Sequence, residues 1–187
     1  MPFLMGEILK NKIGQGINNG ISAYTETERS EKTMFQTIRL KPLALSIGLA
    51  LLAGALGALL GGGMNLDGIQ SPWFMPPPIV FPIAWTILYV LMGTAAYLIY
   101  DSGHPQKKEA LQVYALQLVV NSLWSLFFFR LHWFLFSFLW ILFLIVLVCL
   151  TIYQFYAIEK KAAYLMLPYL IWLLFAALLA FSVYRLN

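Results

Sequence analysis

The segment Ser71–Gly93, SPWFMPPPIVFPIAWTILYVLMG, decides how the rest of the chain is interpreted. Its first half cannot be a regular helix, because Pro76, Pro77 and Pro78 lack a backbone N–H and each disfavours a helical conformation in the residue before it. Its second half carries no charged residue, and the apolar, aromatic character continues to Tyr100. The segment therefore predicts a stiff, extended loop that leads directly into a helix of membrane length.

The composition of the whole chain agrees with a membrane protein. Of its 187 residues, 61% are hydrophobic and only 11% are charged, whereas soluble domains average roughly 45–50% apolar and about 25% charged residues. Each apolar run approaches or exceeds the ~20 residues that span a bilayer, and backbone groups in lipid must be satisfied within the segment, which favours helices. The expected fold is all-α, a polytopic bundle of five transmembrane helices within residues 41–187. The predicted helices cover about 42–63, 79–100, 111–129, 133–156 and 163–184.

Residues 1–40 are polar and mixed in charge. They predict either a flexible extension or a start codon assigned too early, with Met34 as the true first residue. The distribution of lysine and arginine predicts that the N-terminus lies on the inner side of the membrane, and that the C-terminus and the proline-rich loop lie on the outer side. A bacterial plasma membrane is the default location. The net charge of +4 fits this topology better than nucleic-acid binding. The residues expected on the inner side are Arg39, Lys41, Lys107, Lys108, Lys160 and Lys161.

Two of the predicted helices have distinctive compositions. In the first, Ala53, Gly57 and Gly61 recur every four residues, a pattern that lets helix backbones approach closely. This face predicts tight packing within the chain or between two copies of a homodimer. The fourth helix is apolar on all sides, and we expect it to face lipid.

Three of the predicted helices each carry aromatic side chains along one face, and the third also carries two amides on that face. An amide inside a membrane helix is costly unless it has a partner, and Gln117 and Asn121 lie one turn apart. Such faces suit a cavity for a flat, mostly apolar molecule. Simple packing remains the alternative, because tryptophan and tyrosine also gather at membrane interfaces. The faces comprise Trp85 and Tyr89; Tyr114, Gln117, Asn121, Trp124 and Ser125; and Tyr169, Trp172 and Ala176.

Several kinds of chemistry find no support in the sequence. The middle of each apolar run lacks Asp, Glu, Lys, Arg and His, the groups that proton pumps, ion-coupled transporters and voltage sensors need. Cys149 is the single cysteine, so neither a disulfide nor a cysteine-based metal site is predicted. There is no Ser/His/Asp set and no phosphate-binding loop. We predict no catalytic residue, no metal and no cofactor.

Three segments resemble the signature segments of the TspO/MBR family, also called the translocator protein or peripheral-type benzodiazepine receptor family. They are PPPIVFPIAWTILYVLMG at Pro76–Gly93, LQLVVNSLWSLFF at Leu116–Phe128 and LPYLIWLLFA at Leu167–Ala176. The resemblance covers about residues 42–187. It implies a five-helix membrane bundle, often homodimeric, that binds porphyrins and haem in a pocket under the first loop.

The resemblance also implies which residues contact the ligand. The function it predicts is a binding protein, sensor or transporter-like protein for tetrapyrroles. The alternatives are a light-dependent porphyrin-degrading enzyme and a purely structural or partner-binding membrane protein. The chain departs from the family's usual pattern at Ala180, where the family often has asparagine. The implied ligand-binding residues are Pro76, Trp85, Tyr89, Asn121, Ser122, Trp124, Ser125, Trp172 and Ala176.

Overall fold

The computed structural model describes residues 39–63 and 68–187, so the predicted extension over residues 1–40 lies almost entirely outside the described residues. Five helical segments of the described part are long and apolar enough to cross a membrane, which confirms the predicted fold class. Their ends differ from the predicted ends by only a few residues. The elements are α2 (Leu40–Leu60), α3 (Val80–Asp101), α4 (Lys107–Ser125) with its π-helical continuation η1 (Leu126–Arg130), α5 (Phe134–Ile158) and α6 (Lys160–Leu186).

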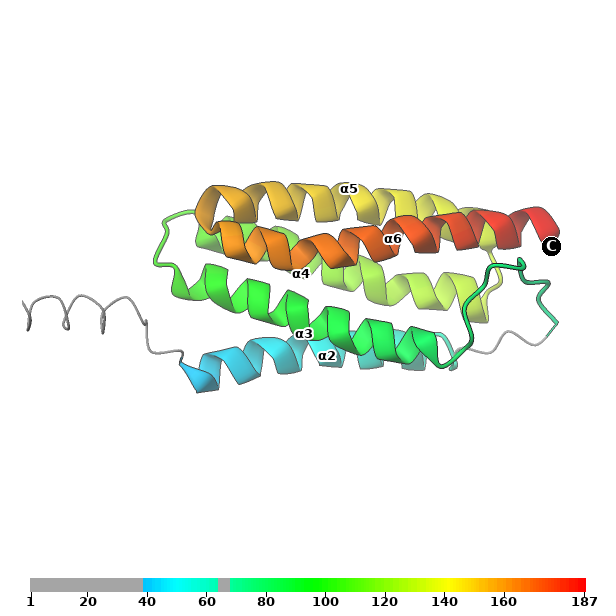
Figure 1. Ribbon diagram of the computed structural model, residues 1–187, viewed down its shortest axis with the longest axis horizontal. Coiled ribbons are helices and arrows are strands. Elements are labelled where there is room, and N and C mark those ends of the chain that lie inside the picture. The colour runs from blue at the N-terminus through cyan, green and yellow to red at the C-terminus, as the bar shows by residue number, and fades with distance from the viewer. Residues whose placement is uncertain (1–38, 64–67) are drawn as a thin grey trace, which may run out of the picture. The chain divides into compact units, whose positions relative to one another are not determined.

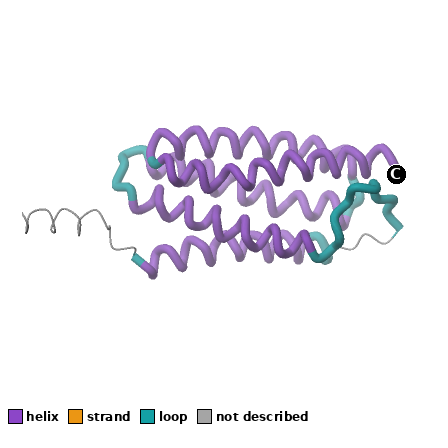
Figure 2. The backbone as a smooth tube through the Cα atoms, in the orientation of Figure 1, coloured by secondary structure: helices purple, strands orange, loops and turns teal. Residues whose placement is uncertain are grey.

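Successive helices of residues 40–187 run in opposite directions (Figure 1). Helix α2 packs beside α3, α5 packs beside α6, and α4 contacts α2, α3 and α5, while α3 also contacts α6. The loop at 68–79 lies at the same end of the bundle as the C-terminus (Figure 2). This arrangement brings the ends of helices that are distant in sequence together beside the proline-rich loop.

Short connections keep neighbouring helices antiparallel. A single residue, Glu159, separates α5 from α6; its backbone is extended (φ −148°, ψ 107°), and its carboxylate accepts the Lys161 backbone N–H at 3.1 Å. Between α4 and α5 the chain turns at His132, which has a positive φ of 54°. The predicted hairpin of the third and fourth apolar runs is therefore confirmed.

Helices α2 and α3 approach each other closely at Gly93. The Ser46 hydroxyl donates to the Gly93 carbonyl oxygen at 2.7 Å. A Cβ atom at Gly93 would lie only 2.5 Å from Ile47 Cα. The close packing of α2 against α3 therefore requires a glycine at position 93.

The small-residue face of α2 packs against α4 within the chain. A Cβ atom would lie 3.2 Å from Ser122 Cα if placed at Gly57, and 3.2 Å from Ser125 Cβ if placed at Gly61. The Ser122 hydroxyl donates to the Ala53 carbonyl oxygen at 2.8 Å. Because α4 covers Gly57 and Gly61, these residues are not available for contact with a second copy of the chain. The homodimer stays a prediction, and its interface would have to lie elsewhere.

Helix α5 does not face lipid on all sides, so that expectation is wrong. One stripe, which includes Ile141, Leu144 and Val148, is buried where α5 packs against α4 and α6. The same stripe holds Ser137 and Thr151, whose hydroxyls each donate to the carbonyl oxygen of the residue four positions earlier, at 2.8 Å. Because the helix is apolar all round, its sequence has no period that identifies the packed stripe.

The loop at 68–79 is attached to the end of the bundle by apolar and polar contacts. Ile69 and Met75 pack against an apolar cluster that contains Phe128 and Val183. The Asn187 side chain accepts the Gln70 backbone N–H at 2.9 Å and donates to the Gln70 carbonyl oxygen at 3.0 Å. It also donates to the Val183 carbonyl oxygen at 2.9 Å, so one amide links the loop to the end of α6.

We expect Asn187→Ala to loosen this loop. Each lost hydrogen bond contributes about 0.5–1.5 kcal/mol, so exchange of the Gln70 amide hydrogen should become roughly 2–10 times faster. Hydrogen-exchange mass spectrometry measures this change. Gln70→Ala is the matched control, because the bonds use the backbone of residue 70 and should survive. Equal protection in the parent and Asn187→Ala would contradict this role for the amide.

Candidate functional site

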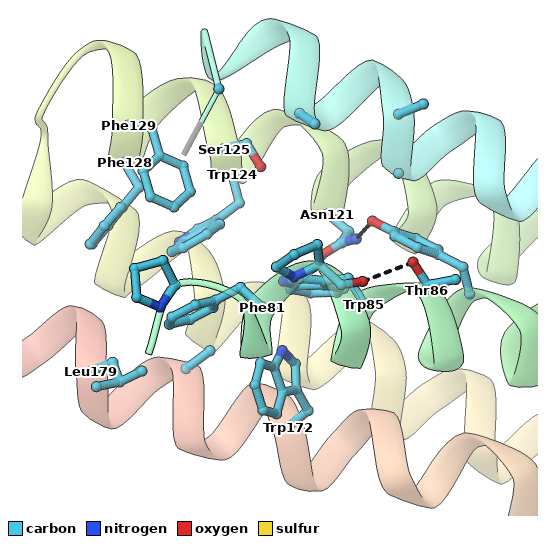
Figure 3. A pocket seen from close by; sticks show the side chains of 18 of the residues that line it. Phe81, Trp85, Thr86, Asn121, Trp124, Ser125, Phe128, Phe129, Trp172 and Leu179 are labelled. Atoms are coloured by element: carbon cyan, nitrogen blue, oxygen red, sulfur yellow. Dashed lines mark hydrogen bonds between the residues drawn. The ribbon is translucent and has the colours of Figure 1, made fainter. Parts of the chain in front are cut away.

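A cavity of about 330 Å³ lies between α2, α3, α4 with η1, and α6, next to the proline-rich loop (Figure 3). Its volume falls at the lower end of the roughly 300–1,000 Å³ range of small-molecule sites. Its lining is mostly aromatic and aliphatic. The residues that line it are Leu51, Gly54, Ala55, Ala58, Gly63, Met75, Pro78, Phe81, Pro82, Trp85, Thr86, Tyr89, Asn121, Trp124, Ser125, Phe128, Phe129, Trp172, Ala176, Leu179 and Ala180.

Helices α3 and α6 share an aromatic wall of the cavity. Phe81, Trp85 and Tyr89 follow one another at intervals of four residues and therefore lie on one face of α3. The Trp85 ring stacks on Tyr89 with centroids 5.6 Å apart, and it meets Trp172 of α6 edge to face at 6.4 Å. Phe81 also meets the Trp172 ring, at 6.1 Å. These contacts hold the two indoles at a fixed mutual angle of 85°.

A buried hydrogen bond joins α3 to α4 at the cavity wall. The Asn121 Nδ2 group donates to the Tyr89 hydroxyl oxygen at 2.7 Å, and both residues are buried while still lining the cavity. The Tyr89 ring occupies the space beside Gly54, where a Cβ atom would overlap the ring. We call these two residues the Tyr89–Asn121 pair. It gives a mostly apolar cavity a fixed polar point.

The π-helical segment η1 provides a second aromatic wall. A π-helical turn contains an additional residue and often occurs at functional sites. Here Phe128 and Phe129, which are consecutive in sequence, both line the cavity. Trp124 stacks on Phe128 at 4.8 Å and meets Phe129 edge to face at 5.7 Å. Its indole N–H donates to the Ser137 carbonyl oxygen at 3.1 Å, so its hydrogen-bonding group is already used in packing against α5.

The cavity lining offers stacking surfaces and neutral polar groups. Among the described residues, no Asp, Glu, Lys, Arg or His belongs to the lining. The Thr86 hydroxyl donates to the Pro82 carbonyl oxygen in its own helix at 2.8 Å. Within residues 39–63 and 68–187, no three His, Cys, Asp or Glu side chains are grouped to hold a metal ion. The geometry therefore favours non-covalent binding of a flat, neutral or mostly apolar surface.

The structure brings most of the predicted site residues together around this cavity. Two lie elsewhere: the Ser122 hydroxyl bonds to α2, and Pro76 is not in the lining, to which the loop contributes Met75 and Pro78. Whether any of these residues binds a ligand stays a prediction. The predicted residues in the lining are Trp85, Tyr89, Asn121, Trp124, Ser125, Trp172 and Ala176.

Sequence reasoning missed other residues of the lining. Helical spacing could have found Phe81, four residues before Trp85, and Ala180, four residues after Ala176. Phe128 and Phe129 could not be found in this way, because the π-helical turn changes the register of α4 just before them.

Comparison with known proteins supports the resemblance seen in the sequence. The TspO/MBR family matches residues 46–185. Protein CrtK of Rhodobacter capsulatus is 36% identical over 139 residues, which cover 72% of this chain and 86% of that protein. The tryptophan-rich sensory protein of Cereibacter sphaeroides is 38% identical over 134 residues, or 70% and 82% of the two chains. The human translocator protein is 32% identical over 123 residues, or 64% and 73%.

The family match covers three of the membrane-spanning segments in full and most of the first and the last. It includes the residues of α2, α3, α4, η1 and α6 that line the cavity. The chain is an integral, multi-pass membrane protein that belongs to the TspO/MBR family.

Proposed function

We propose that the protein binds a tetrapyrrole, or a similar flat and mostly apolar molecule, in the cavity beside the proline-rich loop. The observation that carries the proposal is the meeting of Trp85, Trp172 and Asn121, from three different helices, at one cavity. Aromatic faces stack on a planar ligand, and such contacts contribute about 0.5–1.5 kcal/mol beyond their buried area. Related proteins named tryptophan-rich sensory protein and translocator protein fit a role in sensing or moving such a ligand.

The polar lining suggests how the ligand would be oriented. One N–H of Asn121 donates to Tyr89, so its carbonyl oxygen can accept a hydrogen bond from the ligand and its second N–H can donate one. The part of the lining that the structure describes contains no Lys, Arg or His side chain. We therefore infer that any carboxylates of a tetrapyrrole point toward the loop and water, while the ring system occupies the aromatic part.

We also propose that the cavity faces the outer side of the membrane. The lysine-rich ends of α4 and α6 lie opposite the end that carries the C-terminus (Figure 1). At the lysine-rich end, Lys107 Nζ donates to the Tyr100 carbonyl oxygen at 2.9 Å. The positive-inside rule places this end in the cytoplasm. Labelling of Lys160 or Lys161 by an impermeant reagent added outside intact cells would contradict this orientation.

A titration of the purified protein with protoporphyrin IX, followed by the shift of the Soret band, tests the proposed function. We expect Trp85→Phe and Trp172→Phe each to weaken binding roughly 3- to 10-fold, since part of the stacking surface is lost. The matched control is Trp133→Phe, because Trp133 is exposed and outside the cavity lining. Binding by both cavity variants as tight as that of the control would exclude this site. Protein-dependent bleaching of the Soret band in light alone would favour the degrading-enzyme alternative.

A further inference from the structure

A second group of polar side chains lies in the bundle next to the Tyr89–Asn121 pair. Gln117 precedes Asn121 by four residues and follows Tyr114 by three, so the three residues lie along one face of α4. Tyr169 of α6 meets the Trp85 ring edge to face at 6.2 Å. Tyr89, Tyr114 and Tyr169 belong to the same cluster of buried side chains. The group therefore joins α3, α4 and α6 directly behind the cavity wall.

This group is fully enclosed by the bundle. Gln117 and Tyr169 are 0% exposed, and Tyr114 is 7% exposed. None of the three belongs to the cavity lining. Any molecule bound among them would therefore be separate from the ligand of the cavity.

Polar atoms of this group have no hydrogen-bond partner among the described residues. They are the Tyr114 hydroxyl, the Tyr169 hydroxyl, and both Nε2 and Oε1 of Gln117. Buried polar groups in proteins nearly always have a partner, because burial without one is costly. Helix carbonyl oxygens elsewhere in the bundle accept side-chain donors, but none among the described residues pairs with these atoms. The unpartnered side-chain atoms therefore point to a small polar molecule as their partner.

We propose that Tyr114, Gln117 and Tyr169 form a binding site for water behind the Tyr89–Asn121 pair. The chemistry matches water, because a hydroxyl and a carboxamide can both donate and accept, and a buried water makes about three hydrogen bonds. The three side chains are neutral, so they offer no counter-ion to a charged ligand.

The water site also has a consequence for the cavity. The Tyr89 hydroxyl accepts the N–H of Asn121 and keeps its own proton to donate. Water in the site accepts that proton, which fixes the direction of the hydrogen bond between Tyr89 and Asn121. Tyr114, Gln117 and Tyr169 are thus positioning residues for the Tyr89–Asn121 pair. The water site itself does not depend on which ligand the cavity binds.

Solid-state NMR of the ligand-free protein in bilayers tests the site directly, by transfer of magnetisation from water protons to side-chain amides. We expect the Gln117 amide, assigned by its loss in Gln117→Met, to receive magnetisation from water. The reference is the Trp140 indole N–H, which donates to the Val120 carbonyl oxygen at 2.8 Å and should receive none at the same mixing time. If the Gln117 amide also receives none, the side chains bond to one another without water, and the proposal is overturned.

Thermal unfolding supplies a second, independent test. Gln117→Met keeps the length of the side chain but removes the carboxamide, and we expect the apparent melting temperature to fall by roughly 2–10 °C. Leu118→Met, at the next buried position of α4, replaces one apolar side chain by another and should cause a smaller shift. An unchanged or higher melting temperature for Gln117→Met would overturn the proposal. It would mean that the Gln117 amide is buried without a water partner, because replacing such an amide by an apolar group removes the free-energy cost of burying it.

Discussion

Ala176→Phe is expected to abolish binding of protoporphyrin IX. The apparent melting temperature should change by no more than about 2 °C, which corresponds to a change of less than about 1 kcal/mol in the free energy of unfolding of a chain of this size. Ala176 lines the cavity on α6, one turn from both Trp172 and Ala180. A phenyl ring at this position would project into a space of about 330 Å³. It would therefore compete with the ligand for the aromatic part of the cavity, and its own burial there is favourable.

The matched control for this experiment is Leu174→Phe on the same helix. Leu174 is 50% exposed and lies outside the cavity lining, so the same ring is added on a surface that faces lipid. We expect this variant to bind protoporphyrin IX as the parent does. Undiminished binding by Ala176→Phe would place the ligand elsewhere. A large fall in its melting temperature would mean that the space near Ala176 is too small for a ring.

The sequence predicts the five helices because their signal is a length, and length in residues converts directly into membrane thickness. It does not predict which side of an apolar helix is packed. In α5 the buried stripe of Ile141, Leu144 and Val148 has the same composition as the sides that face lipid. The packed side of α2, in contrast, was recognisable from its small residues, because close approach of two backbones excludes larger ones.

The candidate site was predictable where it lies on regular helices. Trp85 and Tyr89 on α3, and Trp172 and Ala176 on α6, follow the helical period, so their common direction could be derived from spacing alone. Ser122, in contrast, follows Asn121 directly and is rotated away from it by about 100°, and its hydroxyl bonds to α2. Motif resemblance placed it at the site without regard to this rotation.

The loop and the π-helical segment could not be predicted because neither follows a regular period. The proline run indicates that the chain is extended, but not which of its side chains turns toward the cavity; the structure selects Met75 and Pro78 rather than Pro76. In η1 the additional residue of the turn brings both Phe128 and Phe129 to the cavity, whereas an ordinary helix separates consecutive side chains by about 100°.

Gly93→Ala tests whether the close contact between α2 and α3 supports the rest of the bundle. The added Cβ atom would lie 2.5 Å from Ile47 Cα and 2.9 Å from Ile47 N, and these backbone atoms cannot rotate away. The helices must therefore separate, which also strains the hydrogen bond from Ser46 to the Gly93 carbonyl oxygen. Overpacking of this kind costs about 1–3 kcal/mol or more, so we expect the apparent melting temperature to fall by roughly 2–12 °C.

Gly48→Ala on α2 is the matched control, because a Cβ atom there meets nothing within 4 Å. Alanine is the better helix former by about 1 kcal/mol, so its melting temperature should stay equal to that of the parent or rise. Separation of the helices in Gly93→Ala should also weaken binding of protoporphyrin IX, because Leu51 and Gly54 of α2 line the cavity. Equal melting temperatures for Gly93→Ala and Gly48→Ala would mean that α2 can move away from α3 without a loss in the free energy of unfolding. The contact at Gly93 would then not be what holds α2 in place beside the cavity.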